Sequence, residues 1–408
     1  KASMSSSKAP TEKLFSVFAR ANYAYNDTYM LSASIRHEGS SKFSSDKRWA
    51  NFWSLSGGWR ISSEKFMKDI KWIDDLKLRV GYGVTGNNNF SSTYMANMLG
   101  SDAYWLLPNG NWKMSYGKSQ NVNPDLGWEQ KKEWNFGIDY SLLGGRLYGK
   151  FDYFVRNIDN LLYEVTVPQP PFTQPTQWQN IGKMQIKGWE FEIGGVPVKT
   201  KDFVWTSNLN LSHNSGKIKT LWGNNSYYNG NGFPAPGTPG DAARIEEGST
   251  IGKFFIWKWA GFDDNGNFLL YDKDNNVIPA EKKTELDKRY MGDYNPKVIA
   301  SWNNTFTYKN WDLGINVRSW IDFDVFNTMN MYFVIQGRGN NNVLKDAYGK
   351  FNHIRGEKQI CDYYLEDGTF LKIDAITLGY TFDMKKYTKF IKNIRLWGTC
   401  GNVCCITG

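Results

Sequence analysis

Long hydrophobic runs are missing from this 408-residue sequence. A transmembrane helix needs about 18 or more consecutive apolar residues, and no such run occurs, so a helical membrane span is excluded. Apolar residues make up 41% of the chain and the mean hydropathy is −0.55, which is low for a globular protein. This scattered apolar content still suits a membrane-spanning β-strand, because only every second side chain of such a strand faces lipid.

Histidine and cysteine, which carry much of enzyme and metal chemistry, are also scarce. The three histidines are far apart and form no H-E-x-x-H motif, and no G-x-S-x-G nucleophile motif is present. The cysteines show neither a disulfide framework nor the paired spacing of a zinc site; they are Cys361, Cys400, Cys404 and Cys405. We therefore predict that the chain is not an enzyme, with no catalytic residue and no cofactor.

Charge is present but is not concentrated. The net charge is +9, yet Lys and Arg are dispersed among Asp and Glu without a basic run of five, which argues against nucleic-acid binding. Two acidic segments, 263–267 and 272–276, resemble calcium loops, although the second lacks glycine at its sixth position and glutamate at its twelfth. The Asn265-Gly266 pair favours a hairpin turn between strands at Phe254–Phe262 and Phe268–Asp272. Calcium in these loops stays open as an alternative.

Aromatic residues are abundant, at 16% of the chain, and many follow a period-two pattern. In Lys132–Tyr140 one face carries the apolar side chains of Trp134, Phe136, Ile138 and Tyr140, and the other carries Glu133, Asn135 and Asp139. This pattern predicts a strand with one apolar face. About twelve such strands are predicted, at Leu14–Tyr25, Thr28–Arg36, Phe52–Ile61, Leu76–Thr85, Lys132–Tyr140, Arg146–Arg156, Gln185–Ile193, Phe203–Leu211, Val298–Tyr308, Trp311–Val317, Phe370–Tyr380 and Asn393–Val403. In Phe370–Tyr380 the apolar phase shifts partway, which predicts a β-bulge.

The connections between these strands alternate in length. Short ones lie at 26–27, 142–145, 194–202, 309–310 and 383–392, and longer ones at 37–51, 86–130, 157–184, 213–297 and 320–368. Short periplasmic turns opposite long extracellular loops are typical of outer-membrane β-barrels. In the remaining turn, Ser62–Asp75, the spacing of Glu64, Phe66 and Ile70 predicts one amphipathic helical turn at the membrane interface.

The two faces of the predicted strands differ in charge. The apolar faces carry no charge over their central positions, which favours lipid outside, because Arg or Lys at the bilayer midplane costs roughly 2–4 kcal/mol. We expect the other faces to form an interior polar wall facing a plug, built from Arg20, Arg79, Asp139, Lys150, Asp152 and Arg318. The predicted fold class is all-β, a transmembrane antiparallel β-barrel with about twelve strands in this chain.

Nine short motifs follow one another over nearly the whole chain. They are Arg20–Tyr25, Arg36–Phe43, Leu76–Asn87, Leu126–Glu129, Asn180–Gly182, Gly188–Glu190, Gly292–Pro296, Trp302–Phe306 and Leu365–Ile373. Together they resemble the SusC/RagA family of TonB-dependent outer-membrane transporters. The resemblance implies a 22-stranded barrel, plugged by an N-terminal domain, in the outer membrane of a Gram-negative bacterium.

The same resemblance implies partners and a function. A SusD-like surface lipoprotein caps such barrels, TonB supplies energy, and the bilayer and lipopolysaccharide surround them. The implied activity is import of a nutrient, most often an oligosaccharide and in RagA-like members a peptide; a dimer of transporter–lipoprotein pairs stays open. Residues 1–408 are then expected to be the C-terminal portion of the barrel, with the N-terminal plug, the early strands and the last strand absent, and without the signal peptide that export requires.

The long loops hold the candidate cargo contacts, because aromatic faces stack on sugar rings while neighbouring amides and carboxylates satisfy hydroxyls. We predict that five loop aromatics bind substrate: Trp105, Trp112, Tyr116, Tyr227 and Tyr228. Packing within the loops or against the lid is the alternative for each of them. Two other functions stay open, a passive porin and a soluble or surface carbohydrate-binding β-protein.

Overall fold

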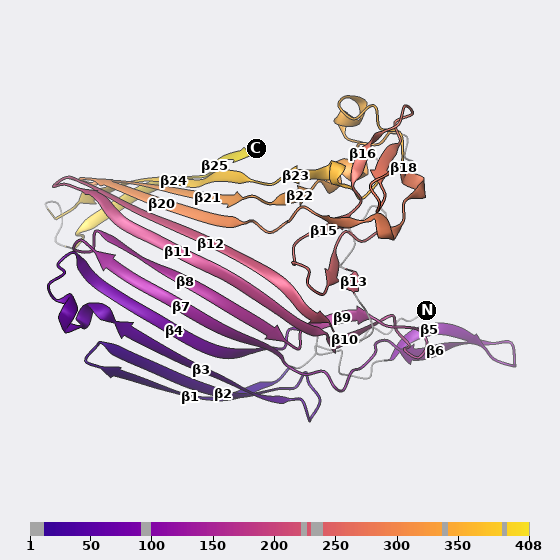
Figure 1. Cartoon of the computed structure of the whole chain (residues 1–408), viewed down its shortest axis with the longest axis horizontal. Helices are drawn as coiled ribbons and strands as arrows, with labels where there is room; N and C mark the ends of the chain where they lie inside the picture. The colour runs from indigo at the N-terminus through magenta and orange to yellow at the C-terminus, as the bar shows by residue number, and fades with distance from the viewer. Residues whose placement is uncertain are drawn as a thin grey trace.

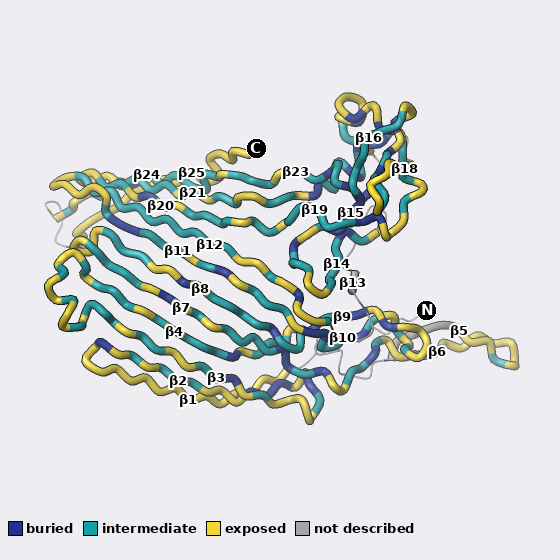
Figure 2. Tube along the Cα trace, in the orientation of Figure 1, coloured by how far each residue is buried: buried dark blue, intermediate teal, exposed yellow. Residues whose placement is uncertain are grey.

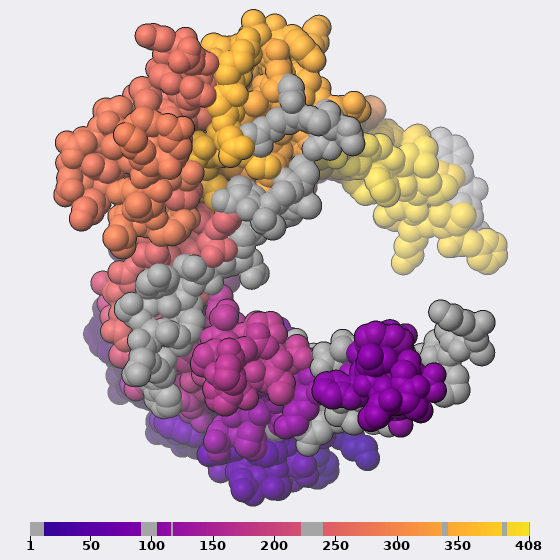
Figure 3. All heavy atoms as spheres, turned by 90° about the vertical axis from the view of Figure 1, so that its right-hand side faces the viewer, coloured from indigo at the N-terminus to yellow at the C-terminus, as the bar shows by residue number. Residues whose placement is uncertain are grey.

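Twelve long strands form one continuous antiparallel sheet. The computed structural model describes residues 12–90, 99–221, 227–229, 240–336, 342–385 and 390–407. Within them the sheet order is β1-β2-β3-β4-β7-β8-β11-β12-β20-β21-β24-β25, so each strand pairs with the next long strand of the chain. Figure 1 shows the sheet from the side, and Figure 3 shows it end-on as a C-shaped wall. The fold is therefore an open section of a β-barrel, which confirms the predicted fold class.

The long strands coincide with the twelve that the alternation predicts. Their bounds are β1 Leu14–Tyr25, β2 Tyr29–Ser40, β3 Trp49–Arg60, β4 Ile73–Asn87, β7 Glu129–Leu142, β8 Leu147–Asp159, β11 Gly182–Lys199, β12 Phe203–Leu221, β20 Val298–Tyr308, β21 Trp311–Ile321, β24 Phe370–Asp383 and β25 Asn393–Thr407. Several strands extend further than predicted on the long-loop side, as in β12, because β11 and β12 stay paired as far as Gly182 and Leu221.

The long connections carry their own short strands at the opposite end from the tight turns (Figure 1). These are β5 Leu99–Leu106, β6 Trp112–Lys118, β9 Leu162–Thr166, β10 Thr176–Asn180, β13 Tyr227–Asn229, β14 Arg244–Glu246, β15 Phe254–Ile256, β16 Trp259–Phe262, β17 Phe268–Tyr271, β18 Val277–Pro279, β19 Arg289–Met291, β22 Asp324–Phe326 and β23 Leu365–Asp367. The helix α1 spans Thr328–Phe333, and short 3-10 turns span 280–282, 285–287, 345–348 and 362–364. No helix in the described ranges is long and apolar enough to cross a membrane.

The tight turns lie at one end of the wall, the end that is predicted to be periplasmic. Leu143, Gly144 and Gly145 all have positive φ, at 59°, 69° and 74°, which lets β7 return directly as β8. The turn between β3 and β4 contains two 3-10 turns, at 61–63 and 65–67, so the predicted helical turn is confirmed in this tighter form. Phe66 in that turn is 64% exposed.

The predicted bulge in β24 is also confirmed. Asn316 pairs with Ala375 while Val317 pairs with Ile373, so Asp374 is an extra residue without a ladder partner. The same break appears in the pairing of β24 with β25. One extra residue changes which side chains share a face, and this explains the phase shift of the apolar pattern.

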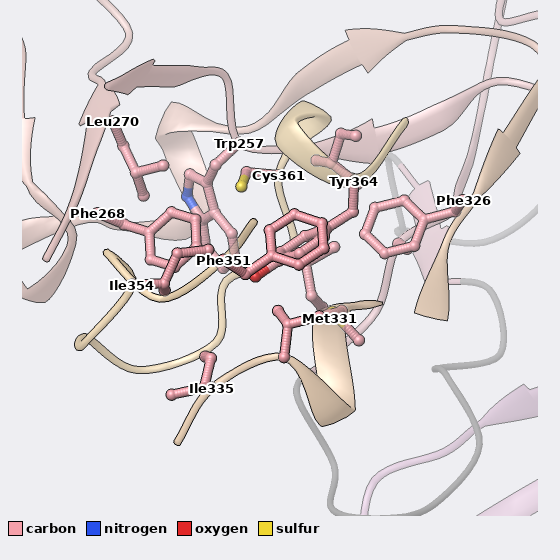
Figure 4. Close-up of a cluster of buried hydrophobic side chains, with 14 residues drawn as sticks. Trp257, Phe268, Leu270, Phe326, Met331, Ile335, Phe351, Ile354, Cys361 and Tyr364 are labelled. Atoms are coloured by element: carbon pink, nitrogen blue, oxygen red, sulfur yellow. The ribbon is translucent and has the colours of Figure 1, made fainter. Parts of the chain in front are cut away.

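Buried side chains gather among the long loops rather than in the wall (Figure 2). The loop base is the buried cluster of Phe43, Phe52, Val84, Phe90, Leu126, Trp128 and Leu162. The loop lobe comprises the described residues of 240–297 and 322–369, from the β12–β20 and β21–β24 connections. Its core, drawn in Figure 4, contains Ile256, Trp257, Phe268, Leu270, Phe326, Met331, Val334, Ile354, Cys361 and Tyr364 among others.

One predicted strand, Phe254–Phe262, is wrong as a single element. Its first part is β15, which pairs with β19, and its second part is β16, which pairs with β17. Trp257, between them, forms a bridge with Cys361 from the other connection of the lobe. A third segment therefore interrupts the strand, which local alternation could not reveal. The predicted hairpin through Asn265-Gly266 is confirmed as β16–β17.

Candidate functional site

The inner face of the wall carries several ion pairs, two of which share Arg79. Arg79 Nη2 donates to Asp139 Oδ1 at 2.8 Å, and its Nη1 lies 3.0 Å from Asp152 Oδ1. Gly137 stands beside this guanidinium, since a Cβ there would come within 2.5 Å of Arg79 Cζ. Further pairs on this face are Lys150–Glu192 and Arg318–Asp374, at 3.4 and 3.2 Å. The charges predicted for an interior polar wall are therefore largely paired with one another; their contact with a plug stays a prediction.

Aromatic motif residues pack together in the loop base. Phe43, which is 2% exposed, lies 5.3 Å from the Phe90 ring and 5.0 Å from the Trp128 ring. Lys42 Nζ donates to the Phe90 carbonyl at 2.7 Å, and Trp128 Nε1 donates to the Arg48 carbonyl at 3.0 Å. The β2–β3 and β4–β7 connections are therefore joined where they leave the wall.

Polar motif residues extend this junction to the β8–β11 connection. The Glu129 carboxylate is 4% exposed and accepts from Asn87 Nδ2 at 2.9 Å and from the Leu162 N–H at 3.0 Å. Asn180 accepts from the Gly127 N–H at 2.8 Å and donates to the Gly127 carbonyl at 3.0 Å. These motif residues serve the architecture of the loops, and they hold three long loops in fixed relation above the wall.

The loop lobe combines an apolar core with buried polar anchors. Asp287 accepts from the Thr284 N–H at 2.7 Å, Thr284 Oγ1 at 2.8 Å and the Lys273 N–H at 2.9 Å. Burial acts to raise the pKa of Asp287, but the hydrogen bonds from Thr284 and Lys273 outweigh burial and lower it. Burial raises the pKa of the Cys361 thiol to about 12, so this cysteine is an unreactive core residue.

Two predicted substrate residues, Trp105 and Trp112, lie on the hairpin β5–β6, which projects from the loop end (Figure 1). Their side chains are 69% and 66% exposed. Trp105 pairs with Lys113 and Leu106 pairs with Trp112, so the two tryptophans lie on opposite faces of the ribbon. One ligand ring can therefore stack on one of them but not on both from the same side of the hairpin.

The other three predicted substrate residues are placed only by their backbone. Tyr116 pairs with Ser101 in the same hairpin, whereas Tyr227 and Tyr228 lie on β13 and pair with residues of β14. Their side chains are outside the described part of the structure. The five residues thus come from two different loops, and their grouping as a substrate site stays a prediction.

The acidic loop segments support turns. Asp263 Oδ1 accepts the N–H groups of Asn265 and Asn267, at 2.9 and 2.7 Å, and Oδ2 accepts Asn267 Nδ2 at 2.9 Å. Asp272 makes the same three kinds of bond within 274–276. Hydrogen bonds from Asn267 lower the pKa of Asp263. Among the described residues, no group of three or more His, Cys, Asp or Glu side chains could hold a metal ion.

The three histidines have separate structural contacts. His37 stacks on Trp49 with ring centroids 4.8 Å apart, His213 Nδ1 lies 2.6 Å from the Lys297 carbonyl, and the His353 ring lies 5.0 Å from Phe262. Each therefore has a local partner in a different part of the chain, and none of these contacts is with a serine or cysteine nucleophile.

A match to a protein-family model shows which family this chain belongs to. The family described as "TonB dependent receptor-like, beta-barrel" matches residues 2–325. The chain belongs to this family. As a TonB-dependent receptor of the SusC/RagA type, it is located in the outer membrane. Members of the family are transporters rather than enzymes.

Two curated relatives agree with the assignment of this chain to the family. TonB-dependent receptor SusC from Bacteroides thetaiotaomicron is 30% identical over 97% of the chain, and the match covers 40% of SusC. TonB-dependent receptor P39 from Formosa agariphila is 33% identical over 66% of the chain, covering 24% of that protein. The chain thus spans less than half the length of the curated relatives it matches.

A solved structure shares the fold of this receptor chain. The structure described as the RagAB peptide transporter superimposes with a TM-score of 0.81 at 23% identity, over 97% of this chain and 44% of the matched one. At this level of identity the likeness establishes the fold alone. It agrees with a barrel section whose strands, turns and long loops are arranged as described above.

Proposed function

We propose that this receptor chain forms part of the barrel of an active nutrient importer. In this proposal the barrel admits an oligosaccharide, a SusD-like surface lipoprotein covers its loop end, and TonB supplies the energy. Membership of the TonB-dependent receptor family and the similarity to SusC support the proposal. The chain spans about 40% of SusC, and in this proposal the plug and the TonB contact come from the rest of the protein.

The observation that carries an oligosaccharide as cargo is the hairpin β5–β6. Trp105 and Trp112 are two-thirds exposed on a ribbon that extends from the rim of the wall. Flat aromatic faces pack well against the apolar faces of sugar rings, and such exposure is costly in water unless a ligand or partner covers it. A peptide is the second candidate cargo, because the RagAB structures that share this fold are described as a peptide transporter.

The test uses the complete receptor purified with its lipoprotein. Binding of glycan and peptide mixtures is measured by calorimetry for the parent protein, for Trp105→Ala and for Trp112→Ala. Tyr348→Ala in the loop lobe is the matched control, since Tyr348 is also 69% exposed. We expect glycan binding to weaken roughly tenfold in at least one tryptophan variant, about 1.4 kcal/mol, and to stay unchanged in the control.

Other outcomes separate the alternatives. Peptide binding without glycan binding would favour the second cargo. Binding that is unaffected by either tryptophan variant would assign the hairpin to packing against a partner. Uptake in cells lacking TonB would contradict active import and favour a passive porin.

A further inference from the structure

The lipid-facing side of the wall is interrupted by an apolar groove near its periplasmic end. The groove has a volume of about 730 Å³ and crosses neighbouring strands from β1 to β8. Its lining is almost entirely apolar and includes Leu31, Gly57, Leu78, Val80, Phe136 and Phe151. These side chains are on the apolar face of the strands, opposite the face that carries Arg79 and its carboxylate partners. The groove therefore opens toward lipid and not toward the lumen.

Gly57 creates this groove. In the ladder it lies between Leu31 of β2 and Val80 of β4, both of which are large and exposed on the same face. A Cβ at Gly57 would meet only Val80 Cγ1, at 3.8 Å, so the space in front of the glycine is open. Side chains of the neighbouring strands line the groove on both sides of Gly57.

The periplasmic end of the groove is tied to the turn between β3 and β4. Tyr29 and Trp59, which line the groove there, both donate to Glu64 Oε1, at 2.6 and 3.0 Å. The Glu64 carboxylate is thus already engaged by two donors, and Asp75 is paired with Arg60 at 3.1 Å. These contacts fix the position of the turn relative to the groove.

The exposed part of this turn is basic and aromatic. Lys65, Lys68 and Lys71 are all exposed, and within the described residues no ion pair involves them. Phe66 and Trp72, interspersed with the lysines, are 64% and 56% exposed. Two acids beside them, Asp69 and Asp74, are also exposed, and Asp74 Oδ2 already accepts from the Gly145 N–H at 2.9 Å. The three lysines therefore leave this surface positive, which suits a phosphate group at the membrane interface. Exposed aromatic rings beside them suit the headgroup region.

We propose that the groove and this turn together bind one anionic glycerophospholipid of the periplasmic leaflet. One acyl chain lies in the groove in front of Gly57, and the phosphate lies against Lys65, Lys68 and Lys71. The apolar groove alone would accept any lipid tail; the basic turn at its end selects the charged headgroup. The inference rests on the family's outer-membrane location and is independent of cargo and of transport.

The test is native mass spectrometry of the complete receptor in detergent, with dioleoyl phosphatidylglycerol or dioleoyl phosphatidylcholine added as the probe. Gly57→Phe fills the groove, and Ala33→Phe is its control, because Ala33 is an exposed position on the same face of β2. Lys65→Glu/Lys68→Glu reverses charge at the turn. Lys199→Glu/Lys201→Glu is its control, because these exposed lysines lie at the end of β11 and in the turn between β11 and β12.

We expect the parent protein to retain phosphatidylglycerol roughly tenfold better than phosphatidylcholine, since each basic residue near the surface adds to the attraction. Gly57→Phe and Lys65→Glu/Lys68→Glu should each lose that retention, and both controls should keep it. Equal retention of the two lipids, or loss in a control, would overturn the site. Loss in Gly57→Phe but not in the lysine variant would also overturn it, because the groove would then hold unselective lipid. The heat-dependent gel mobility of each variant verifies that the barrel is folded.

Discussion

The wall and the loop lobe of this receptor use the same apolar residues in opposite ways. In the wall, Leu55, Leu78 and Leu378 are 48%, 36% and 49% exposed, and their outer neighbour is lipid. In the lobe, Leu270 and Ile354 have no exposed surface and pack against other side chains. The wall therefore depends on the bilayer and on its hydrogen-bonded ladder, whereas the lobe has the close-packed core of a water-soluble protein.

The largest effect should come from a truncation in the lobe core. Leu270→Ala leaves a cavity among rigid neighbours, and we expect the local free energy of unfolding to fall by about 2–5 kcal/mol. Leu378→Ala in β24 should cost much less, because lipid chains can fill the space. Hydrogen exchange of β17 and β24 amides measures both. Equal losses would mean that the wall is packed as tightly as the lobe.

A charge on the outer face should have the next largest effect. Leu55→Arg places a cation in the apolar band, and we expect a cost of roughly 2–4 kcal/mol that appears as poor barrel assembly. Val277→Arg, at a 53% exposed position of the lobe, should change stability by less than about 0.5 kcal/mol. The fraction of heat-modifiable barrel in outer membranes is the measurement. Normal assembly of Leu55→Arg would place water, not lipid, outside β3.

A buried polar anchor of the loop base should have an intermediate effect. Glu129→Ala leaves the Leu162 N–H and Asn87 without their acceptor, at about 1–3 kcal/mol. Glu281→Ala is the control, because Glu281 is an exposed residue of the 3-10 turn at 280–282 in the lobe. Limited proteolysis of the β4–β7 connection should accelerate in Glu129→Ala alone. Similar rates in both variants would show that packing alone fixes the loop base.

The smallest effect should be a pH dependence confined to the lobe. Because the pKa of Asp287 is lowered by its hydrogen bonds, its contribution to stability is present above its ordinary pKa near 4 and is lost as the pH falls. Hydrogen exchange of Lys273 and Thr284, corrected for intrinsic rate, should therefore accelerate below about pH 4. Asp287→Asn should remove this dependence. A lobe that loosened instead on raising the pH would contradict the assigned direction.

The accuracy of the sequence-based predictions follows the same division. The wall was predictable strand by strand, because lipid on one side forces a period-two pattern that can be read locally, including the bulge at Asp374. The lobe was not: the segment Phe254–Phe262 divides between two sheets because Trp257 meets Cys361, more than a hundred residues later. Pairing at that distance leaves no local pattern.

The candidate site was predictable only in part. Exposed loop aromatics were found at Trp105 and Trp112, but their opposite orientations depend on the register of β5 with β6. The role of Glu129 and Asn180 at the loop base was missed, although both lie in the motifs that carry the family resemblance. A motif shows that a residue type is needed at a position but does not reveal which backbone group it must satisfy. The substrate group itself stays a prediction.

The sequence by itself determined the strand pattern, the lipid-facing side and the family, because each depends on residue type at fixed local spacing. Tertiary structure alone decided which loops pack together into the loop base and the loop lobe. It also decided that the Arg79 guanidinium pairs with both Asp139 and Asp152, and that Gly57 leaves a groove on the outer face. Those features depend on strand register and on contacts between distant segments, and register is fixed only when neighbouring strands pair along their full length.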